Sequence, residues 1–284
     1  MQSTTWPLSD KARGLLRRIH VNMPWHLLPR YQDLIEQYRL NLELGFSAAD
    51  LDNVSRRDFQ KAADALARQG SRLTFHGPFW ELCPGSCDPL IRQISRLRLA
   101  QLFDLITIFR PLQVVCHTGF DPRHHSSDHG PWLERALEVW EPLVDRAEQL
   151  NIRLLLENVW ESGPALHRAV FDRLPSSHLG FCLDLGHQHA FSSTPLEQWL
   201  VVLADRLGEI HVHDNDGSRD AHLPVGAGTI AFPTLFGFLL DRGRRPLLTL
   251  EPHEQSHFTA SLNGLAAVLP DRYYGAESVA AAPW

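Results

Sequence analysis

The sequence predicts an α/β fold, a single (β/α)8 barrel in which eight parallel strands alternate with helices. Short β-rich apolar runs recur at intervals of roughly 25 to 40 residues, and each is followed by a helical pattern. No linker rich in Pro, Gly or Ser divides the chain, and its 284 residues match the roughly 250 that one such barrel needs. We therefore expect one domain, residues 1–284. A doubly wound open sheet is the alternative, but no GxGxxG or GxxxxGK[ST] motif follows any predicted strand.

The predicted strands are short and often apolar without interruption, as in VVC, LLL and LLTL. Uninterrupted apolar runs are typical of parallel strands that are covered on both faces. The eight segments are Arg18–Met23, Asn41–Phe46, Arg72–Phe75, Leu112–Cys116, Arg153–Leu156, Leu179–Leu183, Glu209–Val212 and Pro246–Leu250.

Amphipathic segments between these runs are predicted to be helices. In one of them Phe59 and Leu66 share a helical face, and the segment stops at Gly70, a good C-cap residue. The segments are Arg57–Arg68, Asp88–Arg110, Trp132–Leu150, Pro195–Leu207 and Pro233–Asp241. The small, apolar tail Ala276–Trp284 is expected to be frayed or packed across the barrel mouth.

Composition and charge favour a protein that acts on small molecules. The hydrophobic set makes up 44% of the chain and charged residues 21%, which is typical of globular proteins. A net charge of -6 gives no support for a broad surface that binds nucleic acid. No apolar run reaches the ~20 residues of a membrane span, and the first residues do not resemble a signal peptide, so we expect a cytoplasmic location. Assembly into a homo-oligomer is left open.

Cysteine and lysine usage excludes two kinds of chemistry. Four cysteines without paired CxxC spacing describe neither a disulfide scaffold nor a structural zinc site, so Cys83, Cys87, Cys116 and Cys182 are expected to be reduced. Lys11 and Lys61 are the only lysines, and their positions make Schiff-base catalysis improbable.

Ionisable residues follow the predicted strands, directly before a turn. In a parallel barrel all carboxyl ends of the strands open onto one face, so these side chains are expected to converge there. They are His76, His117, Glu157, Asp184, His187, His211, His213, Asp220, His222 and Glu251.

This set predicts a metal centre. A single histidine or aspartate at a strand end is more often a loop cap, but here six strands in succession carry one. Several imidazoles and carboxylates without matching Lys or Arg would repel or be poorly solvated unless a cation lay among them. Nitrogen and oxygen ligands without thiolate suit Zn²⁺, Mn²⁺, Fe²⁺ or Co²⁺.

Other residues near these strand ends have weaker signals. His213 is predicted to bind substrate, to orient a neighbour or to be a ligand, while His189, His253 and the pair His124–His125 are expected in loops or at the rim. Phe79, Trp80 and Trp160 could form walls that stack on a sugar or a base, or could pack within the loops.

The chain resembles the xylose isomerase-like TIM barrel superfamily from the second strand to the eighth. This superfamily holds sugar isomerases and epimerases and also the endonuclease IV group of apurinic-site nucleases. The resemblance implies one to three divalent ions, of zinc, manganese, magnesium or cobalt.

The isomerase and epimerase branch implies a single ion held by Glu157, Asp184, His211 and Glu251. It also implies that Glu157 and Glu251 form an acid/base pair beside a polarised carbonyl and that His187 contacts the substrate. The epimerases carry an arginine shortly after the strand-seven histidine, whereas here Gly217 and Ser218 precede Arg219.

The endonuclease IV branch implies a trinuclear zinc site with the additional ligands His76, His117, His187, Asp220 and His222. Such a cluster suits cleavage of a phosphoester. The segment HVHDNDG lacks that group's HxND motif with a following lysine, and HGPFWELCPG replaces its tyrosine-bearing loop. These differences and the negative charge argue against an apurinic-site nuclease.

Three functions follow from these signals. A metal-dependent isomerase or epimerase of carbohydrate metabolism, acting on a sugar or sugar phosphate, comes first. A multinuclear phosphoesterase follows closely, supported by the five additional ligands. A non-catalytic binding barrel comes last, because both glutamates are intact.

Overall fold

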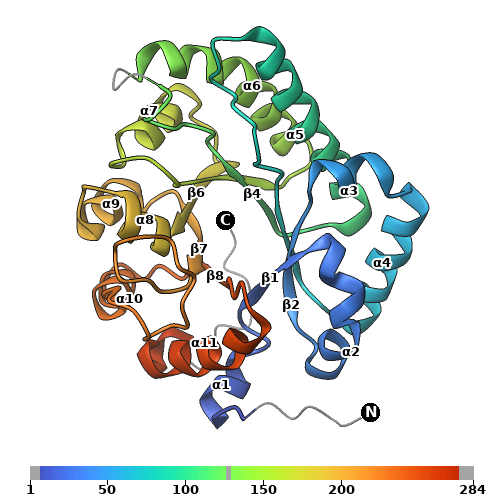
Figure 1. Cartoon of the computed structure of the whole chain (residues 1–284), viewed down its shortest axis with the longest axis vertical. Coiled ribbons are helices and arrows are strands. Elements are labelled where there is room, and N and C mark those ends of the chain that lie inside the picture. Colours follow the sequence, from blue (N-terminus) through green and yellow to red (C-terminus); the bar gives the residue numbers. More distant parts are fainter. Residues whose placement is uncertain (1–6, 126–128, 275–284) are drawn as a thin grey trace.

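The computed structural model describes residues 7–125 and 129–274, and within them the eight strands form a closed parallel barrel (Figure 1). Each strand pairs with the next, and β8 pairs back with β1, where His20 lies opposite Thr249. The single (β/α)8 fold is thus confirmed, and every predicted strand is present with ends within two residues of those expected. The strands are β1 His20–Pro24, β2 Asn41–Gly45, β3 Leu73–His76, β4 Gln113–His117, β5 Arg153–Glu157, β6 Leu179–Asp184, β7 Leu207–Val212 and β8 Leu247–Leu250.

Helices surround the barrel and connect consecutive strands (Figure 1). The five predicted helices are present as α4, α5, α6, α9 and α10, but α9 ends at Leu203, and the predicted end Leu207 is instead the first residue of β7. The helix α4 begins after the cap Ser55 and ends at Gly70, whose φ of 75° explains why a glycine stands there. The helices are α1 Asp10–Leu15, α2 Leu28–Tyr38, α3 Ala48–Asn53, α4 Arg56–Gln69, α5 Pro89–Phe109, α6 Gly130–Gln149, α7 Ala165–Arg173, α8 Leu185–Phe191, α9 Leu196–Leu203, α10 Phe232–Asp241 and α11 Gln255–Val268, with short 3-10 turns at Trp25–Leu27 and Asp271–Tyr274.

The main core lies between the barrel and the helices. Trp140 of α6, Trp199 of α9 and Phe236 of α10 are fully buried there. The helices are thereby fixed against the outside of the sheet by apolar contact. No helix within the described residues is long and apolar enough to cross a membrane. The predicted tail Ala276–Trp284 lies outside the described residues.

The interior of the barrel is partly polar. Val115, Leu155 and Cys182 form a small apolar cluster of their own, each two residues before the strand end of β4, β5 or β6. Because side chains alternate along a strand, residues two positions before the strand ends point into the same interior. On β7, Glu209 lies opposite Cys182 and is fully buried, and it accepts a hydrogen bond from the hydroxyl of the fully buried Thr249 of β8. A layer of mixed polarity therefore lies beneath the strand-end side chains.

Candidate metal centre

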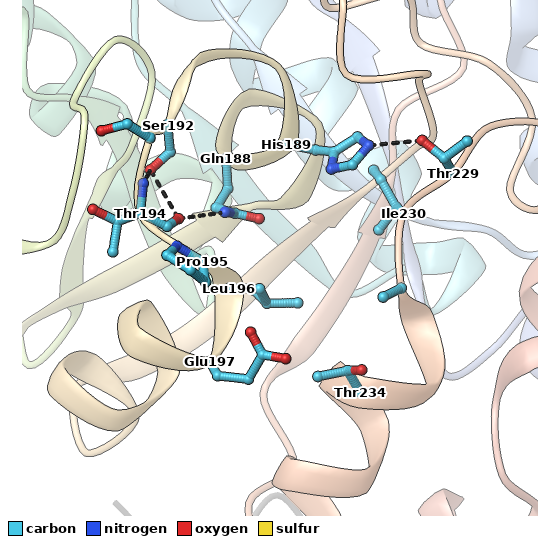
Figure 2. A pocket seen from close by; sticks show the side chains of 12 residues that line it. Gln188, His189, Ser192, Thr194, Pro195, Leu196, Glu197, Thr229, Ile230 and Thr234 are labelled. Carbon is cyan, nitrogen blue, oxygen red and sulfur yellow. Dashed lines mark hydrogen bonds between the residues drawn. The ribbon is translucent and has the colours of Figure 1, made fainter.

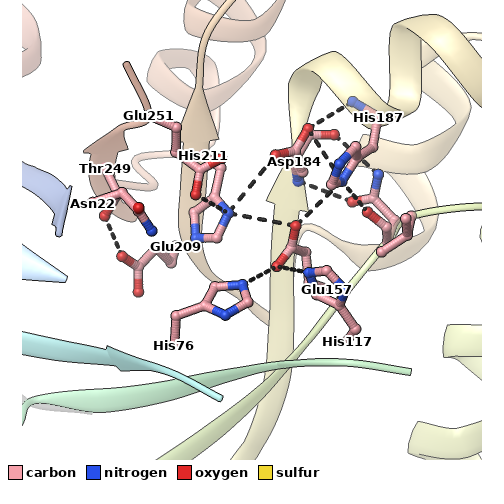
Figure 3. A network of polar contacts seen from close by, with 12 residues as sticks. Asn22, His76, His117, Glu157, Asp184, His187, Glu209, His211, Thr249 and Glu251 are labelled. Atoms are coloured by element: carbon pink, nitrogen blue, oxygen red, sulfur yellow. Dashed lines mark hydrogen bonds and ion pairs between the residues drawn. The ribbon is translucent and has the colours of Figure 1, made fainter. Parts of the chain in front are cut away.

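The strand-end side chains converge around Glu157, the last residue of β5 (Figure 3). Its Oε2 atom lies 3.1 Å from His76 Nε2 and 3.3 Å from His117 Nε2. Its Oε1 atom lies 3.2 Å from His187 Nδ1 and 3.5 Å from His211 Nδ1. The Glu157 side chain is only 1% exposed, so four imidazoles surround one buried carboxylate.

The residues His76, His117 and Glu157 form the first group of potential ligands. One ligand atom from each lies within 4.8 Å of the other two. Parallel pairing places them in adjacent strands, since His117 of β4 is directly opposite Glu157 of β5. We call this set the first ligand group.

A second group surrounds His211 at the end of β7. Its Nδ1 atom lies 3.2 Å from Glu251 Oε1, 3.5 Å from Glu157 Oε1 and 3.7 Å from Asp184 Oδ2. Three carboxylates from β5, β6 and the end of β8 thus face one ring nitrogen. This central ligand group shares Glu157 with the first.

The third group joins α8 to the loop after β7. His187 Nε2 lies 3.4 Å from Asp220 Oδ2, and His222 Nε2 lies 2.9 Å from the same oxygen. The predicted Asp-x-His spacing therefore brings both of its residues to His187. Ligand atoms of these three residues, the third ligand group, also lie within 4.8 Å of one another.

Several buried atoms in and beside the three ligand groups have no hydrogen-bond partner among the described residues. They include His211 Nδ1, His213 Nδ1 and Asp220 Oδ1. Buried polar atoms are seldom left unsatisfied, and an unpartnered nitrogen among carboxylates is what a cation would need. The donor set therefore fits divalent ions.

The orientation of the rings supports the same conclusion. His76 Nδ1 lies 2.9 Å from the Gly77 carbonyl, and His187 Nδ1 lies 3.0 Å from that of Asn158. His222 Nδ1 lies 3.1 Å from the Glu251 carbonyl. Histidines that bind metals usually donate their other ring N–H in this way, which fixes the tautomer and leaves the second nitrogen free to be a ligand.

Mutual electrostatics shift the pKa values of these groups in the metal-free chain. Burial lowers the pKa of His76, but its hydrogen bond with Glu157 and the charge of that carboxylate raise it more, to about 9. Burial raises the pKa of Asp184, but the charges of His187 and His213 outweigh it and lower the pKa to about 2. Without ions His76 thus holds a proton that a bound cation would displace.

His213 is buried within the centre and does not line an open surface. Its Nε2 atom lies 3.1 and 3.2 Å from the two carboxylate oxygens of Asp184, and its ring stacks on His222 with centroids 3.8 Å apart. His213, His222 and Glu251 also form a potential ligand group, with ligand atoms within 4.8 Å of one another. Of the three roles expected for His213, this placement suits a ligand or a residue that orients Asp184. Of the histidines expected in loops or at the rim, His124, His125 and His253 lie in loops, whereas His189 lies in α8. His253 stacks on His222 with ring centroids 3.4 Å apart.

Aromatic rings cover the outer sides of two ligand histidines. Phe79 stacks on His117 with centroids 4.5 Å apart, and Trp80, 80% exposed, lies 5.2 Å from Phe79. Trp160 packs on Phe191 at 4.2 Å, and Phe191 in turn stacks on His187. The three predicted wall residues therefore lie beside the centre, with Trp80 the most accessible.

A pocket of about 340 Å³ lies next to the centre but apart from it (Figure 2). It is lined by residues around α8, α9 and the start of α10, among them Gln188, His189 and Glu197. None of the predicted ligands lines it. His189 Nε2 instead lies 2.8 Å from Thr229 Oγ1, so His189 belongs to the pocket and His187 to the centre.

Sequence reasoning missed the residues that support the ligands. Asn158 pairs with the backbone of Asp184 through both ends of its amide, at 2.9 and 3.0 Å. Glu43 of β2 lies 3.3 Å from His211 Nε2. A glutamate in the middle of an apolar strand, as in NLELG, was the signal that could have revealed Glu43.

Comparison with known proteins places this geometry in a family. The model of the family described as xylose isomerase-like TIM barrel matches residues 38–269. A structure of a Thermus thermophilus protein soaked with ZnCl2 is 30% identical, with a TM-score of 0.69, and the alignment covers 88% of this chain and 97% of that one. The structure of a D-tagatose 3-epimerase-like protein has a TM-score of 0.74 at 19% identity, over 88% of this chain and 96% of that one.

Two relatives match by sequence. An uncharacterized protein of Methanocaldococcus jannaschii is 25% identical over 206 residues, which is 70% of each chain. Fructoselysine 3-epimerase of Escherichia coli O157:H7 is 25% identical over 141 residues, 44% of this chain and 50% of the relative. With the family model matching most of the described barrel, the chain belongs to the xylose isomerase-like TIM barrel family.

Proposed function

We propose that the chain is a metal-dependent phosphoesterase whose centre holds up to three divalent ions. The observation that carries this proposal is the convergence of all nine predicted ligands, including the five that a one-metal isomerase does not need as metal ligands. Their side chains are His76, His117, Glu157, Asp184, His187, His211, Asp220, His222 and Glu251. A one-metal isomerase would use Glu157 and His187, but it would need no metal ligand at His76, His117, Asp220 or His222.

The surroundings of Glu157 favour hydrolysis over isomerisation. An isomerase of this family would need Glu157 to exchange a proton with the substrate, as the sequence analysis expected. Here Oε2 faces His76 and His117, Oε1 faces His187 and His211, and the side chain is almost fully buried. With ions bound, Glu157 would hold them together with these histidines, which would leave it little capacity as a base.

Within this proposal the chain's own residues bind and orient the reactants. Divalent ions held by the three groups would supply Lewis acidity toward a phosphoryl oxygen and an attacking water. Glu251 lies at the edge of the centre with its side chain 11% exposed, so it can hold a proton taken from the water. Phe79 and Trp80 offer an apolar platform for a sugar or another flat leaving group.

The expected substrate is a small phosphate ester that contains a sugar. The net charge of -6 and the departures from the endonuclease IV motifs weigh against DNA. The choice of zinc is supported by the similar Thermus thermophilus protein, whose structure was determined after soaking with ZnCl2.

A sugar isomerase or epimerase is the second candidate, and the relatives favour it. One sequence relative is named fructoselysine 3-epimerase, and solved neighbours include D-psicose and L-ribulose 3-epimerases. The central ligand group would serve that reaction with Glu157 and Glu251 as the acid/base pair and His187 at the substrate.

The double substitution Asp220→Asn with His222→Ala separates the two candidates. It removes two of the three residues of the third ligand group, which phosphoester hydrolysis requires and one-metal isomerisation does not. We expect hydrolysis of bis(p-nitrophenyl) phosphate, assayed with saturating Zn²⁺ or Mn²⁺, to fall roughly 100-fold or more. The matched control is Asp216→Asn with His189→Ala, which changes the same loop after β7 and the helix α8 outside the ligand groups.

Two results would contradict the phosphoesterase proposal. If the wild type epimerises a ketose from a panel of sugars and sugar phosphates, and the double variant retains that activity, the isomerase candidate replaces the hydrolase. Equal losses in the variant and in its control would also contradict a role for the third ligand group.

A further inference from the structure

We propose that Glu43 is a positioning residue that holds His211 with its Nδ1 atom directed at the central ion. The proposal rests on the metal centre of the proposed function but not on which of the two reactions occurs, because both need His211.

Glu43 lies below the strand ends, in the middle of β2. Its Oε2 atom lies 3.3 Å from His211 Nε2, and its Oε1 atom accepts a hydrogen bond of 3.1 Å from the Asn22 amide of β1. Glu43 and His211 are both 0% exposed, so no bulk water competes for these contacts. The carboxylate has no proton to give, so His211 Nε2–H is the donor, and in the neutral ring that a metal requires the lone pair is then on Nδ1.

The unpartnered Nδ1 atom agrees with this orientation within the described residues. It faces Glu157, Asp184 and Glu251, the three carboxylates of the central ligand group, and it has no hydrogen-bond partner among the described residues. A rotation that broke the contact with Glu43 would turn the ligand nitrogen away from that group.

The acceptor behind His211 differs from those behind three other ligand histidines. His76, His187 and His222 each direct their second nitrogen at a backbone carbonyl. A carboxylate accepts a stronger hydrogen bond than a carbonyl, and it makes the opposite ring nitrogen a better electron donor. Glu43 therefore strengthens the central ligand group in particular.

A second reading is that Glu43, Glu209 and His211 themselves hold an ion, since their ligand atoms also lie within 4.8 Å of one another. The partners of Glu209 argue against it. Thr249 and Thr74 donate to its Oε1 atom, and Gln113 donates to Oε2 at 2.7 Å. The oxygens of Glu209 are thus satisfied by side chains, which leaves Glu43 to act through His211.

The test compares Glu43→Gln with Glu209→Gln. Both replace a fully buried carboxylate of the same interior by its amide, but only Glu43 contacts a ligand histidine. We would measure the affinity of the metal-free proteins for Co²⁺ by competition with a chelator, the d–d absorption of bound Co²⁺, and the melting temperature without metal.

We expect Glu43→Gln to weaken the tightest Co²⁺ site 10- to 100-fold and to change its absorption, the size of effect that such supporting residues usually have. Glu209→Gln should leave the affinity within about threefold of wild type. Wild-type affinity and absorption in Glu43→Gln would overturn the proposal, as would an equal loss in Glu209→Gln. A wild type that binds no Co²⁺ would overturn the metal centre itself, which distinguishes the two failures.

A measurement on the unmodified chain keeps the proposal testable if Glu43→Gln does not fold. Nitrogen-15 NMR of the metal-free protein reports the tautomer of His211 directly. We expect the proton on Nε2 with Nδ1 unprotonated at high pH, and a neutral ring protonated on Nδ1 would overturn the proposal.

Discussion

Single residues decide the charge state of the centre. In the metal-free chain His76 has a pKa of about 9, because Glu157 outweighs the effect of burial. Metal ligation requires the neutral imidazole, so protons and ions compete for the same nitrogen. The stability of the free chain and its affinity for metal should then respond to pH in opposite directions.

We predict that the melting temperature of the metal-free protein falls between pH 6.5 and pH 9.5. A histidine whose folded pKa is raised contributes stability that is complete below the unfolded value of 6.5 and is lost as the pH rises through about 9. The contribution of His76 is about 3 kcal/mol at most. Asp184, whose pKa is lowered to about 2, is ionised throughout this pH range, so its contribution to the stability does not change between pH 6.5 and pH 9.5.

Differential scanning calorimetry in a chelator, with His76→Gln as the control, measures this change. The variant should lose less stability over the same range, and the increase in melting temperature on adding zinc should grow with pH in the wild type. A melting temperature that is flat or rises in the wild type would contradict this account.

The sequence was most informative about residues at strand ends. The order of strands and the rule that parallel strands share one open face were enough to predict that the nine candidate ligands lie together. Their supports escaped notice because Glu43 and Asn158 contact residues distant in sequence, and no local pattern specifies such contacts. The role of His213 could not be predicted either, because its burial depends on how the loop after β7 folds over it.

At the scale of elements, the short helix α8 connects the central ligand group, which contains Asp184, to the third ligand group, which contains His187. It begins directly after Asp184, whose side chain caps it by accepting a hydrogen bond of 2.6 Å from the His187 amide. Gly186 lies between them, and a Cβ atom there would be 1.8 Å from the ring of His213. The close approach of α8 to His213 therefore requires a residue without a side chain.

We predict that Gly186→Ala destabilises the metal-free protein by about 1–3 kcal/mol, the usual cost of overpacking a tight contact. It should also weaken metal binding, since His213 would have to move away from Asp184. Gly237→Ala in α10 is the matched control, because a Cβ atom there meets nothing within 4 Å. That change should stabilise the protein by about 0.5–1 kcal/mol.

Urea denaturation of both variants gives the comparison. Equal stability of Gly186→Ala and wild type would mean that α8 shifts freely and that its packing does not fix the centre.

The elements themselves were largely predictable. Strand ends differed by at most two residues, and α4 ended at Gly70 as expected, because apolar runs and capping residues are local signals. The short helix α8 was not among the predicted helices. Its sequence LGHQHAF has little helical pattern, and its start is fixed by the Asp184 cap and by contact with β7.

For the whole molecule, closure of the barrel is what converts scattered residues into one site. His76 is the last residue of β3, and Glu251 directly follows β8. The closed barrel places His76 beside Glu157 and Glu251 beside His211. The fold does not select the reaction, because function depends on the site that a fold carries. The number of ions is therefore the property that separates the accounts.

Metal stoichiometry tests the multinuclear centre most directly. The protein would be purified without chelator or added metal, and its metal content per chain determined by elemental analysis beside the variants Glu157→Ala and Asp220→Asn with His222→Ala. We predict two or three ions per chain in the wild type, one fewer in the double variant, and loss of most metal in Glu157→Ala. A single ion per chain that the double variant retains would contradict the multinuclear account and favour the one-metal isomerase.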